Sequence, residues 1–479
     1  MKHERLVIAG GGPAGLTAAY HATKKGYKPL VMEASGCVGG ISRTEEHQGF
    51  RFDIGGHRFY TKEPLVNEMW HEVMEDDFIQ VPRLSRIYYD GKFLQYPLDP
   101  VDTFFKLGPV ESFLIFCSMV NAKINQRLKP QKEESNFEEW VTNRFGKRLF
   151  NTFFKTYTEK VWGIPCTDIS ADWAAQRISG LSLKRAVMDA FSKKQDAKSL
   201  IRKFEYPRLG PGMMWEKFVS RIEAAGGEVA MNSRVSKIYH KDRHVTMVEQ
   251  EDGTKIVPEQ FISSMPLRTL LQQLSPRPPE AVMKAAAGLK YRDFLVVALF
   301  VNQKDVFPDN WIYIHCPEVG VGRVQNFKNW SVEMVPDPDQ TCLGMEYFCH
   351  ENDGLWDTSD EDLIKVATVE AEQIGLLKES DVFGGKVIRQ PKAYPVYDES
   401  YRENVDIIAE YVRGWDNMQT IGRNGMHRYN NQDHSMMTGI LAIENLQAND
   451  HNLWGVNTER SYQETLKIRE VFKEELAAQ

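Results

Sequence analysis

Short apolar runs and glycine-rich turns alternate at the start of the chain. Residues 5–9 read Arg-Leu-Val-Ile-Ala and run into a glycine-rich turn at 10–15, and residues 16–20 contain strong helix formers. A second apolar run over 28–32 ends at Glu33. Because short apolar runs bounded by turn residues indicate buried strands, the pattern predicts a strand, a tight turn, a helix and a second strand, which together make a βαβ unit.

The spacing of apolar residues becomes helical between about residues 101 and 200. Ser135 and Glu138 stand three residues apart, as in a capping box. The apolar residues that follow share one face of the expected helix, and these are Phe137, Trp140 and Val141. This part of the chain therefore predicts a mainly helical insertion.

Strand-like patterns return after Gly227, over residues 228–238, 294–301 and 342–348. A loop rich in glycine and asparagine at 422–434 then leads into an apolar helix predicted over 436–446. Asp433 and Ser435 are placed to cap the N-terminal end of that helix. The last dozen residues predict a charged helical tail.

Composition and charge are those of an ordinary globular protein and exclude several classes of partner. The chain has 479 residues, 42% of them hydrophobic, and its 59 Lys and Arg against 66 Asp and Glu give a net charge of −7. A dedicated binder of nucleic acid or of an anionic membrane carries a basic surplus. We therefore expect neither as a partner.

No segment of the sequence has the pattern of a membrane span or a metal site. The longest apolar run, at 294–301, has eight residues, far below the ~18 that a membrane helix needs. The N-terminus lacks the apolar core of a secretory signal, so we expect a cytoplasmic protein. The six cysteines lie far apart without a C-x-x-C pair, which predicts neither a zinc site nor a disulfide framework.

The glycine-rich turn has the spacing of a dinucleotide site. Gly10, Gly12 and Gly15 form the G-x-G-x-x-G pattern between a predicted strand and a predicted helix, and Glu33 follows eighteen residues after Gly15. Glycine lets the backbone approach a pyrophosphate at the N-terminus of the helix, and the carboxylate accepts hydrogen bonds from ribose hydroxyls. A second element at 39–44 adds Gly40, Ser42 and Arg43, and Arg43 offers a guanidinium to phosphate oxygens.

These motifs resemble the FAD-binding fold shared by amine oxidases, protoporphyrinogen oxidases, phytoene desaturases and UDP-galactopyranose mutases. The resemblance implies FAD as cofactor and an α/β fold with a Rossmann-like FAD domain of the glutathione reductase type, which is discontinuous and carries a helical insertion and a second, antiparallel sheet domain. It also implies that a strand after the insertion contacts the adenine through the backbone of Val235.

The same resemblance divides the chain into domains. It implies an FAD-binding domain made of residues 1–82, 208–265 and 405–450. It implies a helical domain for substrate binding and oligomerisation at 100–207, which leaves a homo-oligomer open, and a sheet domain made of 83–99 and 266–404. Residues 451–479 would form the helical tail.

Four further stretches are similar to UDP-galactopyranose mutase, and to its larger eukaryotic form above all. They are residues 53–61, 157–177, 310–331 and 394–435. The resemblance implies cofactor contacts from Gly55, Gly56, Gly422, Arg423, Gln432, Asp433 and Ser435. It implies substrate contacts from Tyr96, Asp99, Thr158, Trp162, Tyr313, Tyr394, Tyr429 and Asn431.

The reaction implied by this resemblance is redox-neutral. Reduced FAD uses N5 as a nucleophile on the anomeric carbon of a nucleoside-diphosphate sugar, and the sugar ring then opens and recloses from pyranose to furanose. His57 would orient the reactive edge of the flavin, and Arg177 and Arg323 would hold the leaving diphosphate. NAD(P)H is a candidate external reductant.

The residues themselves also allow less specific interpretations. His57 could be a structural histidine, Trp162 a core residue, and Arg177 and Arg323 ordinary surface cations. Two distant arginines and several tyrosine hydroxyls nevertheless suit a diphosphate, because charge-assisted hydrogen bonds contribute ~1.5–3 kcal/mol each.

Two positions depart from the mutase pattern. Thr158 and Asp99 stand where the family has two amides, and the link from Tyr429 to Gln432 is two residues shorter than in the eukaryotic enzymes. An ionised Asp only accepts hydrogen bonds, whereas an amide also donates them. The identity of the nucleotide is therefore open, with a preference for a nucleotide other than UDP slightly favoured.

Two other functions fit the FAD motifs. One is a flavin-dependent oxidase or desaturase, which would consume oxygen or another electron acceptor. The other is an escort protein like the Rab GDP-dissociation inhibitors, which share the fold without using a flavin. Glu33 and Arg43 argue against the escort protein.

Overall fold

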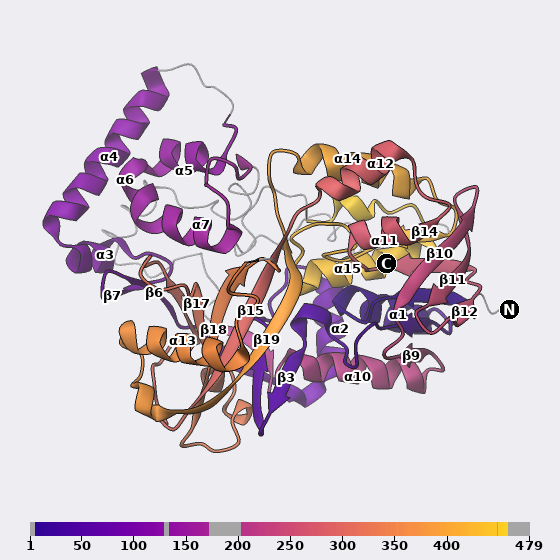
Figure 1. Ribbon diagram of the computed structural model, residues 1–479, viewed down its shortest axis with the longest axis horizontal. Coiled ribbons are helices and arrows are strands. Elements are labelled where there is room, and N and C mark those ends of the chain that lie inside the picture. The colour runs from indigo at the N-terminus through magenta and orange to yellow at the C-terminus, as the bar shows by residue number, and fades with distance from the viewer. Residues whose placement is uncertain (1–4, 129–133, 172–202, 352, 448, 458–479) are drawn as a thin grey trace, which may run out of the picture.

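The computed structural model describes residues 5–128, 134–171, 203–351, 353–447 and 449–457, and three groups of elements can be distinguished in it (Figure 1). A parallel sheet with its helices lies on one side, and a seven-stranded sheet lies beside it. A helical arm stands above the seven-stranded sheet. Residues 172–202 and 458–479 lie outside the described residues, and with them the end of the predicted insertion and most of the predicted C-terminal tail at 451–479.

The first group is built on a five-stranded sheet in the order β20-β13-β1-β2-β9, in which all neighbours are parallel. Its strands are β1 (Leu6–Ala9), β2 (Leu30–Met32), β9 (Glu228–Ala230), β13 (Gln260–Ser263) and β20 (Met418–Thr420). All four residues of β1 are buried, as expected for a parallel strand covered on both faces. The predicted strand–turn–helix–strand unit at the N-terminus is thus present.

Three helices pack beside this sheet: α1 (Pro13–Lys24), α10 (Pro211–Ala224) and α15 (Gln432–Asn445). Helix α1 contacts both α10 and α15. The approach of α15 to α1 is close, because a Cβ on Gly439 would lie 2.5 Å from the carbonyl oxygen of Ala14. This contact brings the N-terminal part of α15, some 420 residues later in the chain, to the glycine-rich turn.

A second, four-stranded sheet in the order β12-β11-β10-β14 belongs to the same group. Its strands are β10 (Val235–Lys241), β11 (His244–Gln250), β12 (Lys255–Ile256) and β14 (Leu274–Ser275). The prediction of one strand over 228–238 was wrong, since β9 and β10 are separate strands of different sheets. The chain turns between them at Asn232, whose φ is +51°.

Further elements complete the first group. The strand pairs are β3 (Thr44–His47) with β4 (Phe50–Asp53) and β5 (Phe78–Pro82) with β8 (Lys203–Pro207), and the helices are α2 (Pro64–Met74), α11 (Leu267–Gln273), α12 (Glu280–Gly288) and α14 (Tyr401–Arg413). The apolar side chains of α11 and α12 are buried in the same core cluster as β1. We therefore propose a domain boundary near residue 290 in place of 266.

The seven-stranded sheet has the order β19-β15-β18-β17-β16-β6-β7. Its strands are β6 (Ser85–Tyr89), β7 (Lys92–Gln95), β15 (Tyr291–Val301), β16 (Trp311–Ile314), β17 (Arg323–Asn326), β18 (Thr341–Cys349) and β19 (Val382–Pro395). Strands β15 and β18 confirm the predictions at 294–301 and 342–348. Every pair is antiparallel except β6 with β16, so the predicted antiparallel sheet contains one parallel pair. Helix α13 (Asp360–Gln373) packs against β15 and β19.

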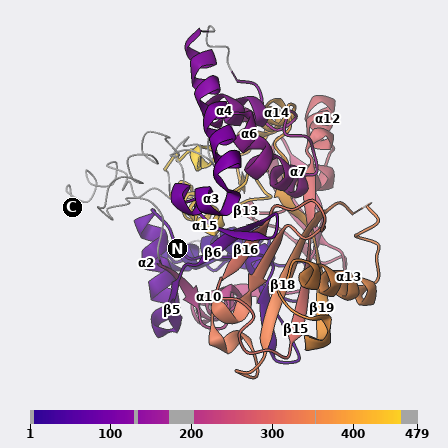
Figure 2. The same ribbon diagram turned by 90° about the vertical axis from the view of Figure 1, so that its left-hand side faces the viewer.

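The helical arm consists of α3 (Pro100–Leu107), α4 (Pro109–Leu128), α5 (Phe137–Phe145), α6 (Lys147–Leu149) and α7 (Thr156–Trp162), and Figure 2 shows α4 rising away from the rest of the molecule. The predicted capping box was wrong by one residue. Asn136 is the cap of α5 and accepts the N–H of Glu139 at 2.9 Å, while Ser135 donates to the Glu139 side chain. The predicted apolar face is buried, with Phe137, Trp140 and Val141 inside.

Within the described residues, no helix is long and apolar enough to cross a membrane. Residues 451–457, the start of the predicted tail, include Leu453 and Trp454, and both are buried in the core of the first group.

Candidate functional site

The glycine-rich turn has the backbone geometry that a dinucleotide site needs. Gly10 has a φ of +106°, and a Cβ on Gly15 would lie 1.9 Å from the carbonyl oxygen of Gly10. Neither position tolerates a side chain. The turn ends at Gly12, which is the N-cap of α1. The twelve-residue helix therefore begins directly after the turn, with its N-terminus beside it. Helix N-termini attract phosphate groups because their N–H groups are unpaired.

The second glycine element lies against the first. The N–H of Gly39 donates to the carbonyl of Gly11 at 2.8 Å, and a Cβ on Gly40 would lie 3.4 Å from the Cα of Gly12. Ser42 turns inward and donates to the carbonyl of Gly39 at 3.0 Å. The glycine loop of the βαβ unit and the one that follows β2 thus pack directly on each other, and glycine at both leaves the backbone accessible to a pyrophosphate.

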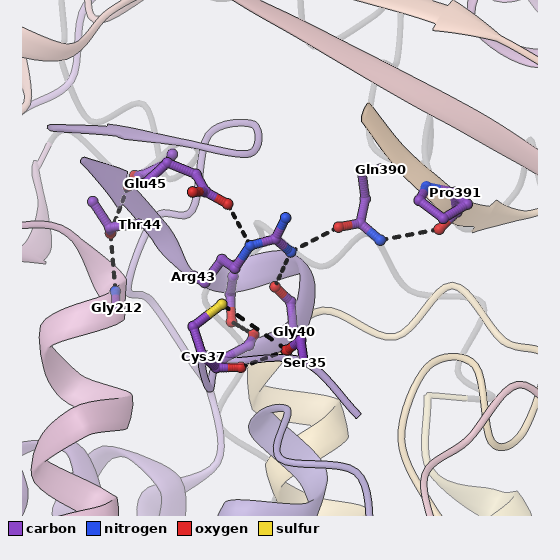
Figure 3. A network of polar contacts seen from close by, with 12 residues as sticks. Ser35, Cys37, Gly40, Arg43, Thr44, Glu45, Gly212, Gln390 and Pro391 are labelled. Atoms are coloured by element: carbon purple, nitrogen blue, oxygen red, sulfur yellow. Dashed lines mark hydrogen bonds and ion pairs between the residues drawn. The ribbon is translucent and has the colours of Figure 1, made fainter. Parts of the chain in front are cut away.

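Arg43 is held by three oxygen acceptors (Figure 3). Its Nε donates to Glu45 at 2.6 Å, and its Nη1 donates to the carbonyl of Gly40 at 2.9 Å and to Oε1 of Gln390 at 2.8 Å. Gln390 belongs to β19, so this guanidinium joins the glycine loop to the seven-stranded sheet. A phosphate contact from Arg43 stays a prediction. The hydrogen bonds that Arg43 makes hold the second glycine loop against β19.

Glu33 lies at the end of β2, as the sequence predicts. Its Oε2 accepts the N–H of Gly11 at 2.7 Å, and its Oε1 accepts the N–H of Ser35 at 2.8 Å. The backbone carbonyl of Glu33 accepts the N–H of Ser233, which brings the segment before Val235 to the same edge. The Val235 carbonyl accepts from Gln273 at 2.7 Å. The arrangement fits the ADP half of a dinucleotide, with the adenine contact of Val235 still a prediction.

His57 follows two glycines that side chains of the seven-stranded sheet approach, and Gly55 has a φ of +95°. A Cβ on Gly55 would lie 3.5 Å from Nη2 of Arg323, and one on Gly56 would lie 2.9 Å from Nε2 of Gln325. Burial, followed by the charges of Arg323 and Arg423, lowers the pKa of His57 to about 3. The imidazole is therefore neutral at physiological pH. It can orient a partner through a hydrogen bond but cannot donate a proton as an imidazolium.

Arg323 is the partly buried member of an ion pair, and its side chain is 19% exposed. Its Nε donates to Oε2 of Glu346 at 2.5 Å, and the Glu346 side chain is fully buried. Gln325 donates to the other carboxylate oxygen at 2.9 Å. Burial disfavours the charged guanidinium, but Glu346 keeps the pKa of Arg323 well above its usual value. The interpretation of Arg323 as an ordinary surface cation was therefore wrong.

Glu346 was not among the predicted site residues. It lies directly opposite Arg323 in the register of β17 and β18. One signal was present in the sequence, because Glu346 is the lone charged residue in the predicted strand 342–348. A carboxylate inside an apolar strand is buried only with a partner.

An aromatic wall stands beside this pair. Tyr394 and Tyr429 stack with ring centroids 5.7 Å apart, and Trp162 lies 6.3 Å from Tyr394 and 6.0 Å from Tyr429. The guanidinium of Arg423 lies 4.1 Å from the centroid of the Tyr429 ring. Trp162, Tyr394 and Tyr429, predicted as substrate residues from segments far apart in sequence, are thus brought together with a cation.

A second aromatic cluster includes two more of the predicted substrate residues, Tyr96 and Tyr313. Tyr313 lies 4.9 Å from Tyr96 and 5.5 Å from Tyr157 between ring centroids. Thr158 is the next residue of α7 and is buried. Tyr157 was quoted in the motif but not predicted as a site residue. Burial raises the pKa of its hydroxyl well above the usual value, and the charge of Arg323 opposes that shift.

Asp99 has a structural role that the sequence did not reveal. It is the N-cap of α3, and its Oδ1 accepts the N–H of Asp102 at 2.7 Å. Asp is a preferred capping residue and Gln is not. A helix cap accounts for the departure from the mutase pattern at this position without any change of nucleotide.

The cap of α15 also differs from the prediction. The helix begins at Gln432, its N-cap is Asn431, and the capping box is formed by Asn431 with His434. Asp433 and Ser435 lie inside the first turn, so the prediction that they precede the helix was wrong. Gln432 donates to the carbonyl of Arg58 at 3.3 Å, which ties this helix end to the segment of His57.

Two further contacts position the 422–431 loop. Gly422 donates its N–H to Thr438 at 2.9 Å. The hydroxyl of Tyr397 accepts the N–H of Tyr429 at 2.8 Å. Tyr397 was overlooked, because nothing in its sequence neighbourhood indicates a partner 32 residues away. Arg177, the other predicted diphosphate ligand, lies outside the described residues.

Comparison with protein families decides how these motifs are classified. Residues 13–368 match the family of flavin containing amine oxidoreductases. The chain belongs to this family. FAD is its cofactor, and the two glycine loops, the N-terminus of α1 and Glu33 would hold it.

Two curated proteins to which the chain is similar are desaturases. The 1-hydroxycarotenoid 3,4-desaturase of Flavobacterium sp. (strain P99-3) is 27% identical over 52% of this chain and 54% of its own length. The 15-cis-phytoene desaturase of Synechococcus elongatus is 21% identical over 77% of this chain and 80% of its own. The first match thus spans about half of that relative, and the activity of these proteins does not transfer by itself.

Solved structures extend the likeness over nearly the whole chain. A reduced UDP-galactopyranose mutase has a TM-score of 0.82 at 21% identity, covering 96% of this chain and 99% of that one. A putative protoporphyrinogen oxidase from Exiguobacterium sp. 255-15 has a TM-score of 0.71 at 17% identity, covering 93% and 100%. At these identities the likeness concerns the fold alone, and it confirms the α/β FAD-binding fold with several sheets.

Proposed function

We propose that this amine oxidoreductase family member is a redox-neutral sugar-nucleotide mutase, which interconverts the pyranose and furanose forms of a nucleoside-diphosphate sugar. The observation that carries the proposal is the polar, cationic character of the wall beside His57. Arg323, Arg423 and the hydroxyl-bearing rings of Tyr157, Tyr394 and Tyr429 converge there. A desaturase of a polyene has no use for partly buried cations, whose desolvation is costly.

When bound and reduced, FAD supplies a nucleophilic nitrogen that can displace a diphosphate from an anomeric carbon. The residues of this chain bind and orient the reactants. Arg323, held by Glu346, and Arg423, held against Tyr429, would offset the negative charge that develops as the diphosphate leaves. Neutral His57 would orient the flavin edge. Tyr394, Tyr429 and Trp162 would exclude water from the reacting centre.

The nucleotide preference of the proposed enzyme follows from Asp99 and Thr158. Because Asp99 caps α3, its identity is no longer a reason to expect a nucleotide other than UDP. Thr158 has a hydroxyl that both donates and accepts hydrogen bonds, as an amide does. We therefore propose UDP-hexopyranoses as the first substrates to test, with dTDP, GDP and CDP sugars beside them.

The experiment is anaerobic incubation of dithionite-reduced protein with each pyranose, followed by separation of the nucleotide sugars by anion-exchange chromatography. A furanose product that forms without stoichiometric reductant supports the proposal, and oxidised protein is the matched control. NAD(P)H replaces dithionite in a second series to test it as the reductant.

A desaturase or oxidase is the second candidate, because the curated relatives are desaturases. It predicts a product poorer in hydrogen and steady uptake of oxygen or of an added quinone. Turnover of this kind, in the absence of any furanose product from the panel of nucleotide sugars, would replace the mutase proposal.

Arg323→Lys tests the diphosphate role without leaving Glu346 unpaired. Lysine keeps a cation beside the carboxylate but loses the planar fork that binds two oxygens at once. We expect FAD to stay bound while KM for the nucleotide sugar rises about tenfold or more, as the loss of a charge-assisted contact implies. Unchanged kinetics would remove Arg323 from the binding site.

A further inference from the structure

Helix α7 brings residues of the helical arm beside residues of the seven-stranded sheet. Thr158 and Trp162 stand four residues apart in α7, so they lie on the same side of the helix. Arg323 belongs instead to β17. The helix contacts the sheet at β18 (Figure 1). The spacing between the two sets of proposed substrate contacts therefore depends on what joins α7 to the sheet.

Lys160 lies on α7 between Thr158 and Trp162 and binds a loop of the sheet. Its Nζ donates to the carbonyl oxygens of Cys316 at 2.9 Å, Val319 at 2.9 Å and Val321 at 3.0 Å. An ammonium group has three N–H donors, so all three are used. The three acceptors belong to the loop between β16 and β17, which ends directly before the strand of the proposed diphosphate ligand.

Glu370 of α13 holds the same loop from the other side. Its carboxylate accepts the N–H of Gly320 at 2.6 Å and the N–H of Val321 at 2.9 Å. The carbonyl of Val319 and the N–H of Gly320 belong to one peptide group, and in a trans peptide they point in opposite directions. The lysine and the glutamate therefore bind the two ends of one peptide dipole. Burial lowers the pKa of Lys160, and the charge of Glu370 acts against that shift.

A second cation lies at the C-terminal end of α7. Arg292 of β15 is 7% exposed, and its Nε donates to the carbonyl of Val161 at 3.3 Å. Its Nη2 donates to the carbonyl of Phe348 in β18 at 2.6 Å, so one guanidinium joins the end of the helix to two strands. The chain has glycine where this side chain passes, since a Cβ on Gly163 would lie 2.6 Å from Cζ of Arg292. A cation at this end also stabilises the helix dipole.

We propose that Lys160 and Arg292 are positioning residues of the nucleotide-sugar site. Together they fix α7, and with it Thr158 and Trp162, relative to Arg323. The inference rests on the proposed function, because it concerns the spacing of proposed substrate contacts. Apolar packing would hold α7 without desolvating two cations. Hydrogen bonds, however, have direction, and a reacting centre needs its groups held within about 0.5 Å.

The first test is the affinity of the reduced, FAD-loaded protein for a nucleoside diphosphate, measured by isothermal titration calorimetry with UDP, dTDP, GDP and CDP. For the tightest of the four we expect Lys160→Met to raise the dissociation constant about tenfold or more. In the furanose assay we expect kcat/KM to fall about a hundredfold, as a displacement of about 1 Å implies. Methionine keeps most of the side chain and removes its three donors.

Lys328→Met is the matched control for this measurement. Lys328 also donates to backbone carbonyls, those of Lys304 at 2.8 Å and of Pro338, and these groups do not belong to α7 or to the loop before β17. The control should keep the affinity and the kcat/KM of the natural chain. Flavin absorbance per protein reports that each variant is folded.

Hydrogen exchange separates positioning from a purely structural role. A purely structural lysine would lower the melting temperature and leave the affinity of the folded protein unchanged. In Lys160→Met we expect faster amide exchange in the peptides that span 156–162 and 316–322, together with the loss of affinity. Exchange in the FAD-binding group should stay as in the natural chain.

Glu370→Gln tests the same loop without a change in α7, and it takes the place of Lys160→Met if that variant does not retain FAD. The amide keeps one acceptor oxygen for the two N–H groups. We therefore expect the dissociation constant to rise about threefold to tenfold, as the loss of one hydrogen bond implies.

Two results would overturn the inference, and they can be told apart. If the natural chain binds one of the four diphosphates and the Lys160 variant, or Glu370→Gln in its place, binds it equally well, the inference is wrong while the proposed function stands. A lower melting temperature would then mark a purely structural lysine. If the natural chain binds none of the four, the proposed function is wrong and the inference is wrong with it.

Discussion

The two glycine loops and the aromatic wall beside His57 are built in opposite ways. The loops are made of backbone from two nearby segments, 10–15 and 39–43. Glycine is required where a Cβ would collide, as at Gly15 with the carbonyl oxygen of Gly10 and at Gly39 with Trp215. The wall is made of side chains from five distant segments, and its centre is an ion pair between neighbouring strands. A backbone site depends on local sequence, whereas a side-chain site depends on how sheets and helices are brought together.

The largest effect is expected from a substitution in the glycine-rich turn at 10–15. Gly15→Val would place a side chain 1.9 Å from the Gly10 carbonyl at the first carbon, so the turn cannot form. We expect purified protein without FAD and a thermal transition lowered by many degrees. Flavin absorbance per protein and the melting temperature measure this. Gly354→Val is the control, since no atom lies within 4 Å of its Cβ position, and normal flavin content in Gly15→Val would contradict the close approach.

The next effect concerns the ion pair of the wall. Removing one partner of a buried pair costs about 3–5 kcal/mol, because the other charge stays buried without compensation. Arg323→Met and Glu346→Met should each lose about that much unfolding free energy in urea, and the double variant should lose much less than the sum. Strictly additive losses would mean that the two groups do not act as a pair.

Asp53 lies in the chain between the 39–43 loop and His57, and its ionisation makes the stability of the protein depend on pH. Asp53 accepts hydrogen bonds from Tyr206 at 2.5 Å and Thr44 at 2.9 Å, yet burial raises its pKa to about 7. The unfolded chain ionises near 3.9, so between about pH 4 and 7 the folded state keeps a proton that the unfolded state has lost. Stability therefore falls as pH rises through this window, by up to about 4 kcal/mol, and is constant above it.

Asp53→Asn removes this titration. The difference in melting temperature between pH 5 and pH 8 should be smaller in the variant than in the natural chain, because the neutral amide carries no ionisation penalty. Identical pH profiles for the two proteins would show that Asp53 ionises normally in the folded state.

The smallest expected effect is a loss of affinity for the nucleotide sugar when one hydroxyl group is removed. Tyr397→Phe removes the acceptor of the Tyr429 N–H and should cost about 1 kcal/mol, or roughly fivefold, in affinity for the nucleotide sugar. Tyr401→Phe is the matched control, since its ring stacks on Tyr397 at 4.0 Å while its hydroxyl donates to His427 instead. A larger rise in KM for Tyr401→Phe would assign the positioning of this loop to the other tyrosine.

Particular residues show how far sequence reasoning reached. The strand at 5–9, the helix that continues over 16–20 and Glu33 were predicted because the fingerprint is local and its residues are fixed by backbone geometry. Glu346, Gln390 and Tyr397 were overlooked because each acts on a partner far away in sequence. Asp99 was interpreted as a nucleobase contact, although a carboxylate just before a helix beginning with proline is also an N-cap signal.

The sequence by itself determined the strand, the glycine-rich turn and the helix at which a dinucleotide is predicted to bind, since the spacing of small residues between a strand and a helix is a local signal of backbone geometry. Only the tertiary structure decided that Arg323 is the partner of the buried Glu346, that Asp433 and Ser435 lie inside α15, and that the outer face of α4 is exposed. Local periodicity reports which residues are apolar and where the backbone turns. Burial and pairing arise when distant segments meet, and no local pattern contains that information.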